Sequence, residues 1–183
     1  MSFLEFLALL RADLLRLTLS ADGNIPIKPS WIKILNPRFT PVLFVRLARY
    51  LYLSKWLRFF SPVFTWLNVF IFGIEFTARC NVGPGLFLPH TVGTVIGARK
   101  IGANVTIYQG VTVGAKYADL IFDESKRPVI EDDVAVGAGA KVLGDIIVGQ
   151  GVKIGPNSVV LESIPAGAVV TVGQIQQADV SVS

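Results

Sequence analysis

The sequence predicts a mainly β fold, a left-handed parallel β-helix (hexapeptide repeat) preceded by an α-helical N-terminal segment. Two observations carry this prediction. From residue 76 onward an aliphatic or aromatic residue recurs at every sixth position, often with glycine directly after it. Before that point the apolar residues recur at three- and four-residue spacing, which is typical of amphipathic helices.

The N-terminal segment, residues 1–74, is expected to hold three helices. The first covers residues 3–18, and a Gly/Pro-rich link follows at residues 22–30. The second runs from about residue 41 to residue 53, with Arg46 and Arg49 on its polar side. The third begins near Pro62, because proline suits the first turn of a helix.

The N-terminal segment carries a net positive charge, and its last part is apolar. Residues 1–75 carry 9 basic and 4 acidic side chains (net +5), and residues 76–183 carry 8 and 9 (net −1). Residues 59–74 are uncharged, but Pro62 and Gly73 leave the run too short to span a bilayer. Packing on protein and peripheral membrane contact, with Trp56 and Trp66 at the surface, both remain open. Nothing indicates nucleic-acid binding.

The six-residue period identifies the fold of residues 75–172. Six is neither the helical period of 3.6 nor the strand period of two, and it is typical of a solenoid in which three short faces close one coil. The repeated residue points into a narrow interior, and the tight turns between faces need glycine or another residue that tolerates left-handed geometry. The expected inward positions are Phe76, Val82, Leu88, Val95, Ile101, Ile107, Val113, Ile130, Val136, Val142, Val148, Ile154 and Val160.

Two interruptions of the repeat are the candidate functional regions. One extra residue lies between Leu88 and Val95, around His90. An insertion between Val113 and Ile130 is long enough to form a projecting loop, residues 115–128. Residues 173–183 follow the repeat as a C-terminal tail.

His90 is the only histidine of the chain and the candidate general base. Glu75 directly precedes an inward position, so we expect it near the matching corner one coil below, where its carboxylate could orient the imidazole. A solvated charge is the alternative for Glu75. With one histidine, the three-histidine zinc site of solenoid carbonic anhydrases is excluded, and no metal site is expected. The single Cys80 forms no disulfide and suits a reducing cytosol.

The segments IEFTARCNVGPGLFLPHTVGTVIG (74–97), TIYQGVTVGA (106–115) and VAVGAGAKVLGDIIVGQGVKIGPNSVVLESIPAG (134–167) carry a family resemblance. They resemble the serine acetyltransferase branch of the hexapeptide-repeat acyltransferases, including the shorter relatives of exopolysaccharide and colanic-acid biosynthesis. The spacing of fifteen between Glu75 and His90 is its most specific feature.

The resemblance implies a homotrimer with the active site between adjacent solenoids, His90 as base and Glu75 as its orienting acid. It also implies acetyl-CoA as co-substrate, lying along the outer corners of the later coils. The implied cofactor-binding residues are Gly114, Ala115, Gly137, Ala138, Lys153 and Pro156. A solvated lysine is the alternative for Lys153.

Three departures from the family bear on the acceptor. Pro89 stands where the family has aspartate, Lys126 and Arg127 stand where it has Arg-His, and the N-terminal segment is short. We therefore expect O-acetylation of a sugar hydroxyl in surface or exopolysaccharide biosynthesis, with Arg127 and Lys126 near the acceptor. A lipid-linked saccharide is one form that this acceptor could take. Serine O-acetylation in cysteine biosynthesis is the alternative, and a non-catalytic trimeric scaffold is a further one.

Overall fold

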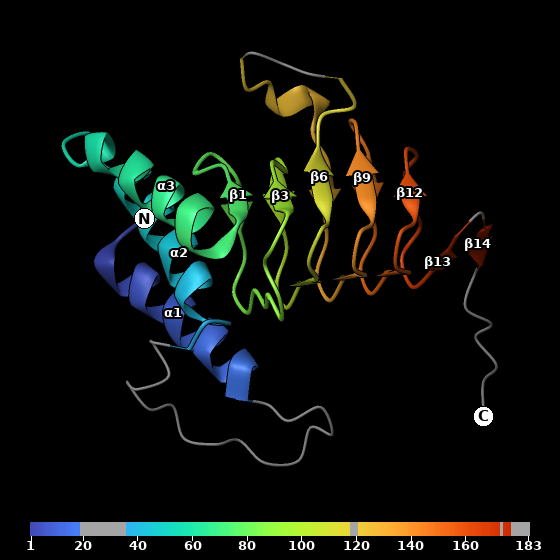
Figure 1. Cartoon of the computed structure of the whole chain (residues 1–183), viewed down its shortest axis with the longest axis horizontal. Coiled ribbons are helices and arrows are strands. Elements are labelled where there is room, and N and C mark those ends of the chain that lie inside the picture. The colour runs from blue at the N-terminus through green and yellow to red at the C-terminus, as the bar shows by residue number, and fades with distance from the viewer. Residues whose placement is uncertain (19–35, 118–120, 173, 177–183) are drawn as a thin grey trace.

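The structure is a computed structural model that describes residues 1–18, 36–117, 121–172 and 174–176. A group of helices lies against the N-terminal end of a solenoid, and a loop projects from the middle of the solenoid (Figure 1). The Gly/Pro-rich link expected at residues 22–30 lies outside the described residues.

The helices form where the apolar spacing predicts them. They are α1 (Phe3–Thr18), α2 (Thr40–Leu53) and α3 (Ser61–Phe72), with the short 3-10 turn η2 (Arg58–Phe60) before α3. Both α2 and α3 have a proline in the first turn, where its missing N–H costs no hydrogen bond. Gly73 ends α3 in the left-handed conformation, with φ 62°. In the described part of the chain no helix is long and apolar enough to span a bilayer.

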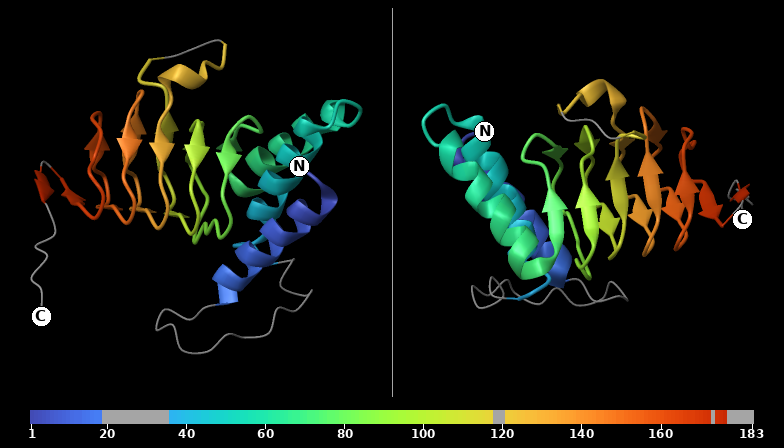
Figure 2. Two further views of the ribbon diagram at one scale, coloured as in Figure 1. Left: turned by 180° about the vertical axis from the view of Figure 1, so that it is seen from behind. Right: turned by 45° about the horizontal axis from the view of Figure 1, so that its top comes forward.

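The solenoid begins at Ile74, and its strands stack into three sheets in the described residues (Figure 2). Apart from the antiparallel pair at the C-terminus, the pairing within them is parallel, as a left-handed β-helix requires. The first sheet holds β1 (Ile74–Phe76), β3 (Thr94–Ile96), β6 (Thr112–Gly114), β9 (Lys141–Leu143) and β12 (Val159–Val160). The second holds β2 (Asn81–Val82), β4 (Lys100–Ile101), β7 (Val129–Ile130) and β10 (Ile147–Val148). The third holds β5 (Thr106–Ile107), β8 (Ala135–Val136), β11 (Lys153–Ile154), β13 (Val169–Thr171) and β14 (Gln174–Gln176).

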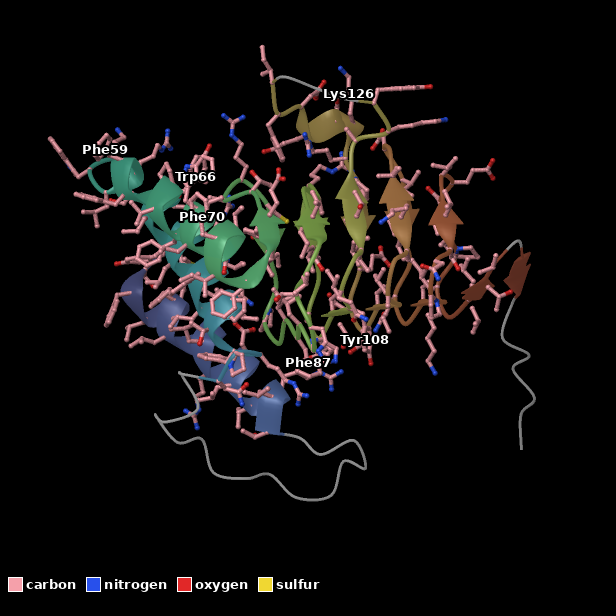
Figure 3. The ribbon with its side chains drawn as sticks, viewed as in Figure 1. Phe59, Trp66, Phe70, Phe87, Tyr108 and Lys126 are labelled. Carbon is pink, nitrogen blue, oxygen red and sulfur yellow. The ribbon has the colours of Figure 1, made fainter. Side chains whose placement is uncertain are left out.

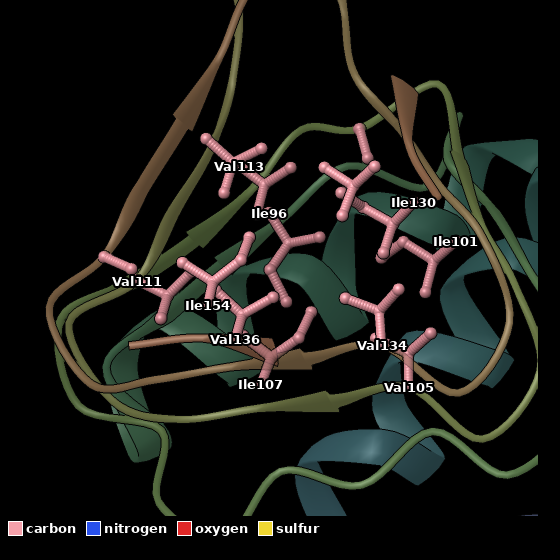
Figure 4. Close-up of a cluster of buried hydrophobic side chains, with 14 of the residues drawn as sticks. Ile96, Ile101, Val105, Ile107, Val111, Val113, Ile130, Val134, Val136 and Ile154 are labelled. Atoms are coloured by element: carbon pink, nitrogen blue, oxygen red, sulfur yellow. The ribbon is translucent and has the colours of Figure 1, made fainter. Parts of the chain in front are cut away.

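The interior of the solenoid is one continuous aliphatic cluster, part of which Figure 4 shows. Each coil places its inward residues beside those of the next coil, so apolar area is buried between layers as well as within them. Val42 and Val45 of α2 belong to the same cluster, and Phe72 of α3 packs against it. The helices therefore cover the open end of the solenoid interior.

The predicted inward position Val95 is wrong, because the register places Ile96 there instead. β1 pairs with β3 so that Phe76 lies beside Ile96 and Glu75 beside Val95. Strand side chains alternate, so Val95 points outward, and its burial is intermediate whereas Ile96 is buried. The step from Leu88 to the next inward residue is therefore eight residues, and the following step to Ile101 is five.

The glycines that follow inward residues have a different role from the predicted one. A Cβ on Gly137 would lie 2.7 Å from the Pro156 nitrogen, so this glycine is required by the close approach of the next coil. The left-handed turn position lies two residues later, at Gly139, with φ 73°. In the next coil Asn157 takes this turn position, with φ 57°.

A buried ion pair fastens the helices to the first coil, and it corrects the prediction that Arg46 lies on a polar surface. Arg46 donates from Nε and Nη2 to the Asp13 carboxylate of α1, at 2.8 and 2.9 Å. Its Nη1 also donates to the Val82 carbonyl at 2.6 Å. The Leu86 N–H donates to Asp13 at 2.9 Å. Arg46 thus joins α1 and α2 to the coil that leads to His90.

Candidate active site

The segment around His90 is held by hydrogen bonds to backbone carbonyls at the end of α3. The Thr91 hydroxyl donates to the Phe72 carbonyl at 2.8 Å, and the Gly93 N–H donates to the Gly73 carbonyl at 2.9 Å. The Thr94 hydroxyl donates to the Tyr108 carbonyl of the next coil at 3.3 Å. The eight-residue step is therefore a fixed bulge, and His90 lies at its start.

His90 is exposed in a hollow of about 370 Å³ at the corner between the third and first sheets. The bulge forms one wall of this hollow with Pro89 and Thr91. The turn before α2 and the end of α3 form the other, and among the described residues of this wall Arg38 is the one charged side chain. An open imidazole beside a guanidinium suits a general base acting on a small substrate that carries an anionic group. Arg38 was not among the predicted site residues.

Within one chain the structure does not bring Glu75 and His90 together. Glu75 points outward from the middle of β1, and its neighbour in the next coil is Val95, five residues beyond His90. Glu75 lines two hollows, of about 620 and 580 Å³, and neither includes His90 among its lining residues. The expectation that the two share a corner took Glu75 as part of the corner before Phe76, whereas the structure places it within β1.

The hollow of about 580 Å³ gathers several of the other predicted residues at the far edge of the first sheet. Gly114 and Ala115 line it where the projecting loop leaves β6, together with Glu75. Arg127 enters from the loop, donating to the Gly97 carbonyl at 2.9 Å with its guanidinium 4.0 Å from the centre of the Phe122 ring. This hollow therefore combines backbone groups, a carboxylate and a guanidinium.

Lys126 lies outside this hollow, on the outer side of the projecting loop (Figure 3). Its ammonium group is 3.1 Å from the Asp123 carboxylate. Hydrogen bonds from Ser125 and Lys126 lower the pKa of Asp123 below its usual value, so this carboxylate stays charged as the cap of η3 (Glu124–Lys126). Of the two predicted acceptor-contacting residues, Arg127 lines the hollow of about 580 Å³ and Lys126 does not.

The remaining predicted cofactor residues lie on the third sheet or at the corner that follows it, where His90 also lies. Gly137 and Ala138 follow β8, Lys153 is exposed on β11, and Pro156 follows β11. In Figure 3, Phe87 and Tyr108 mark this edge in the earlier coils, opposite the edge where Lys126 projects. The six predicted cofactor residues are thus divided between two edges of the chain. Four lie on the edge of His90, and Gly114 and Ala115 lie on the edge of the projecting loop.

One chain therefore carries the predicted site residues in two groups on different edges, and we call each group a half-site. One half-site has His90 and the later corner backbone, and the other has Glu75, Gly114 and Arg127. Solenoids packed side by side would bring one edge of each chain against the other edge of its neighbour. In the described residues, no group of three or more His, Cys, Asp or Glu side chains is placed to hold a metal.

Comparisons with known proteins give one consistent result. Residues 127–162 match the family model "Bacterial transferase hexapeptide (six repeats)". A serine acetyltransferase of Helicobacter pylori is 42% identical over 138 residues, covering 75% of this chain and 78% of that protein. A serine acetyltransferase of Bacillus subtilis is 40% identical over 121 residues, and the match spans 66% of this chain and 54% of that protein.

Solved structures extend the likeness to the helices. Neisseria gonorrhoeae serine acetyltransferase in complex with serine superposes with a TM-score of 0.76 at 26% identity, covering 93% of this chain and 68% of that one. Brucella abortus serine acetyltransferase in complex with coenzyme A superposes with a TM-score of 0.76 at 28% identity, covering 96% and 70%.

Proposed function

The chain belongs to the serine acetyltransferase family of hexapeptide transferases, and we propose that it is a serine O-acetyltransferase that uses acetyl-CoA. The observation that carries the proposal is the 42% identity over 138 residues, which includes the His90 bulge within a shared solenoid. The family's reaction is O-acetyl transfer, and coenzyme A is bound in the solved Brucella relative.

The expected sugar acceptor is wrong. It was inferred from Pro89, Lys126 and Arg127, which depart from the family pattern. The similar proteins are nevertheless serine acetyltransferases, and none of these comparisons supports the exopolysaccharide branch or polysaccharide biosynthesis. The alternative stated with that prediction, serine O-acetylation in cysteine biosynthesis, is the one the comparisons favour.

In the proposed reaction His90 accepts the hydroxyl proton of serine as the oxygen attacks the thioester carbon of acetyl-CoA. The tetrahedral intermediate then collapses, the C–S bond breaks, and His90 returns the proton to the departing thiolate. Both substrates are consumed and O-acetylserine and CoA are formed. We place this reaction in the cytoplasm, in keeping with a buried, reduced Cys80.

We propose further that the site is completed by a neighbouring subunit of a trimer. A carboxylate can orient an imidazole only within hydrogen-bond distance. Glu75 and His90 lie in separate hollows of one chain, so the Glu75 that meets His90 would come from the next chain. The same contact would bring Gly114 and Arg127 to the CoA and acceptor bound beside His90.

A complementation experiment tests the shared site. His90→Ala and Glu75→Ala chains are co-expressed with two different affinity tags and purified through both, so that every trimer contains both variants. Going round such a trimer, one interface in three combines an intact His90 with an intact Glu75, so about a third of wild-type activity returns. Trimers of either variant alone provide the control. Mixed trimers as inactive as the controls would contradict a site shared between chains.

The acceptor is tested by release of free thiol from acetyl-CoA with L-serine, and absence of serine turnover would overturn the proposed function. We assign the serine carboxylate to Arg38, because this guanidinium lines the His90 hollow. A charge-assisted hydrogen bond contributes about 1.5–3 kcal/mol, so Arg38→Gln is expected to raise the KM for serine roughly tenfold or more. With serinamide, which has no carboxylate, the variant and the wild type should have similar KM values.

A further inference from the structure

Helix α3 is apolar on its outer face as well as on its inner face, where Phe64 and Phe72 pack against Phe44 of α2. Its buried residues are the polar Ser61 and Asn68. The Ser61 hydroxyl donates to the Ala48 carbonyl of α2 at 2.8 Å, and the Asn68 amide donates to the Pro41 carbonyl at 3.2 Å. Hydrogen bonds between small polar side chains and a neighbouring helix, with apolar residues outside, are typical of helices that face lipid.

The outward face of α3 and η2 is a continuous aromatic and aliphatic surface. Phe59, Val63, Trp66 and Phe70 follow one another at three- and four-residue spacing, so they share one side of the helix. Their exposed fractions are 85%, 50%, 59% and 77%. The rings of Trp66 and Phe70 stack with their centres 5.5 Å apart. We call this surface, together with Trp56 at 92% exposure, the aromatic face.

The aromatic face lies at the end of the molecule, beyond the solenoid. Figure 3 shows Phe59 at the tip of the helical group, with Trp66 and Phe70 following along α3 toward β1. In both views of Figure 2 the turn between α2 and α3 is the part of this hairpin farthest from the strands. The edges that carry the two half-sites run along the solenoid instead, so packing solenoids side by side would leave the tip uncovered.

Apart from Glu75, which lines the same hollow as Arg58 and Trp66, the charges next to the aromatic face are positive. Residues 36–74 contain five basic side chains and no acidic one, namely Arg38, Arg46, Arg49, Lys55 and Arg58. Arg46 and Arg49 are used internally, in the ion pair with Asp13 and in hydrogen bonds to backbone carbonyls. Lys55 and Arg58 are exposed beside the aromatic rings, with Arg58 stacked 4.6 Å from the centre of the Tyr52 ring.

We propose that the aromatic face is a peripheral binding surface for an anionic lipid bilayer. Tryptophan and phenylalanine enter the boundary between headgroups and acyl chains, and adjacent lysine and arginine pair with anionic headgroups. A neutral bilayer lacks the second interaction, and a second copy of this chain would bring the same positive charges together. The charge therefore selects anionic lipid over the other two occupants.

Vesicle flotation of the full chain tests this surface. Wild-type protein is expected to float with vesicles of phosphatidylglycerol and phosphatidylcholine. A Trp56→Ser/Phe59→Ser/Phe70→Ser variant should lose at least about a hundredfold in partitioning, since each aromatic ring buries a large apolar area. Lys55→Gln/Arg58→Gln should lose about fivefold per charge, and wild type should weaken similarly in high salt. Val159→Ser/Leu161→Ser, exposed at the other end of the solenoid, is the matched control and should bind as wild type.

Two results would overturn the proposal. One is wild-type protein that fails to float with anionic vesicles, or that floats equally well with pure phosphatidylcholine. The other is a triple variant whose oligomer mass, measured by light scattering, is smaller than that of wild type. That result would show that the aromatic face is an interface between copies of this chain. Serine acetylation by the triple variant in solution should equal that of wild type, so failure of this proposal is distinguishable from failure of the proposed activity.

Discussion

Removing Asp13 should destabilise the protein more than any exposed charge change, because it leaves the Arg46 charge buried without a partner. The two side chains are 0% and 3% exposed. Asp13→Ala removes both hydrogen bonds from Arg46 and the acceptor of the Leu86 N–H. Breaking a buried ion pair in this way costs about 3–5 kcal/mol in the free energy of unfolding. For a chain of this size that corresponds to a fall in Tm of roughly 10 °C.

The assay is urea and thermal unfolding followed by circular dichroism, at one protein concentration because assembly contributes to stability. Arg99→Met is the matched control, since Arg99 and Asp145 form an exposed pair at 3.9 Å that is expected to contribute less than about 1 kcal/mol. Asp13→Ala/Arg46→Met should lose less than the sum of its single variants, because no unpaired charge remains. If Asp13→Ala cost no more than Arg99→Met, the ion pair would not hold the helices to the first coil.

Three further predictions concern the site, the coils and the thiol. His90→Ala should lower turnover at least about a hundredfold while the oligomer mass measured by light scattering is unchanged, and near-normal turnover would remove the base from the mechanism. Gly137→Ala should lower the free energy of unfolding by about 3 kcal/mol, because the new Cβ forces the Pro156 backbone away. Gly151→Ala should lower it by only about 1 kcal/mol, because φ is 71° there but no atom lies within 4 Å of the new Cβ. Burial raises the pKa of Cys80 to about 12, so its thiol should react with Ellman's reagent at pH 8 only after unfolding, and folded stability should fall as the pH rises above about 9.

The sequence predicted the solenoid and the helices because both depend on periods that a single chain displays. A helix needs only its own apolar stripe, and α1 begins and ends at the predicted residues 3 and 18. The six-residue repeat likewise follows from the chain alone. The left-handed solenoid with N-terminal helices is confirmed by the serine acetyltransferase structures that it superposes on.

The register at the bulge could not be predicted from the count. Val95 and Ile96 are both β-branched and aliphatic, so either could fill the interior. The choice depends on pairing with Phe76 below and Val113 above, which place Ile96 inward. The bulge then takes two additional residues and the next step is one residue short. The net insertion is therefore the one residue that the count shows, but the count cannot say which of the two steps is lengthened.

The ion pair of Arg46 was not predicted, although the position of Asp13 in the sequence indicates that it needs a partner. Asp13 lies three residues after Leu10 and four before Leu17, on the predicted apolar stripe of α1. A carboxylate on a buried stripe requires a cationic partner. The candidates were several arginines, and the tertiary contact between α1, α2 and the first coil selected Arg46. Long-range pairing of this kind cannot be read from spacing within one helix.

The same limitation explains why the acceptor prediction was wrong and why Glu75 and His90 were expected at one corner. Pro89 and Arg127 were judged as replacements for particular family side chains, as though a site were a set of independent positions. In the fold, a residue's contribution depends on which edge it lies on and on what the opposing surface supplies. Arg38, from the turn before α2, lines the His90 hollow and can provide the charge that a carboxylate acceptor needs. Serine chemistry therefore does not require the family's own side chains at Pro89 and Arg127, provided that the hollow keeps an open base and one cation.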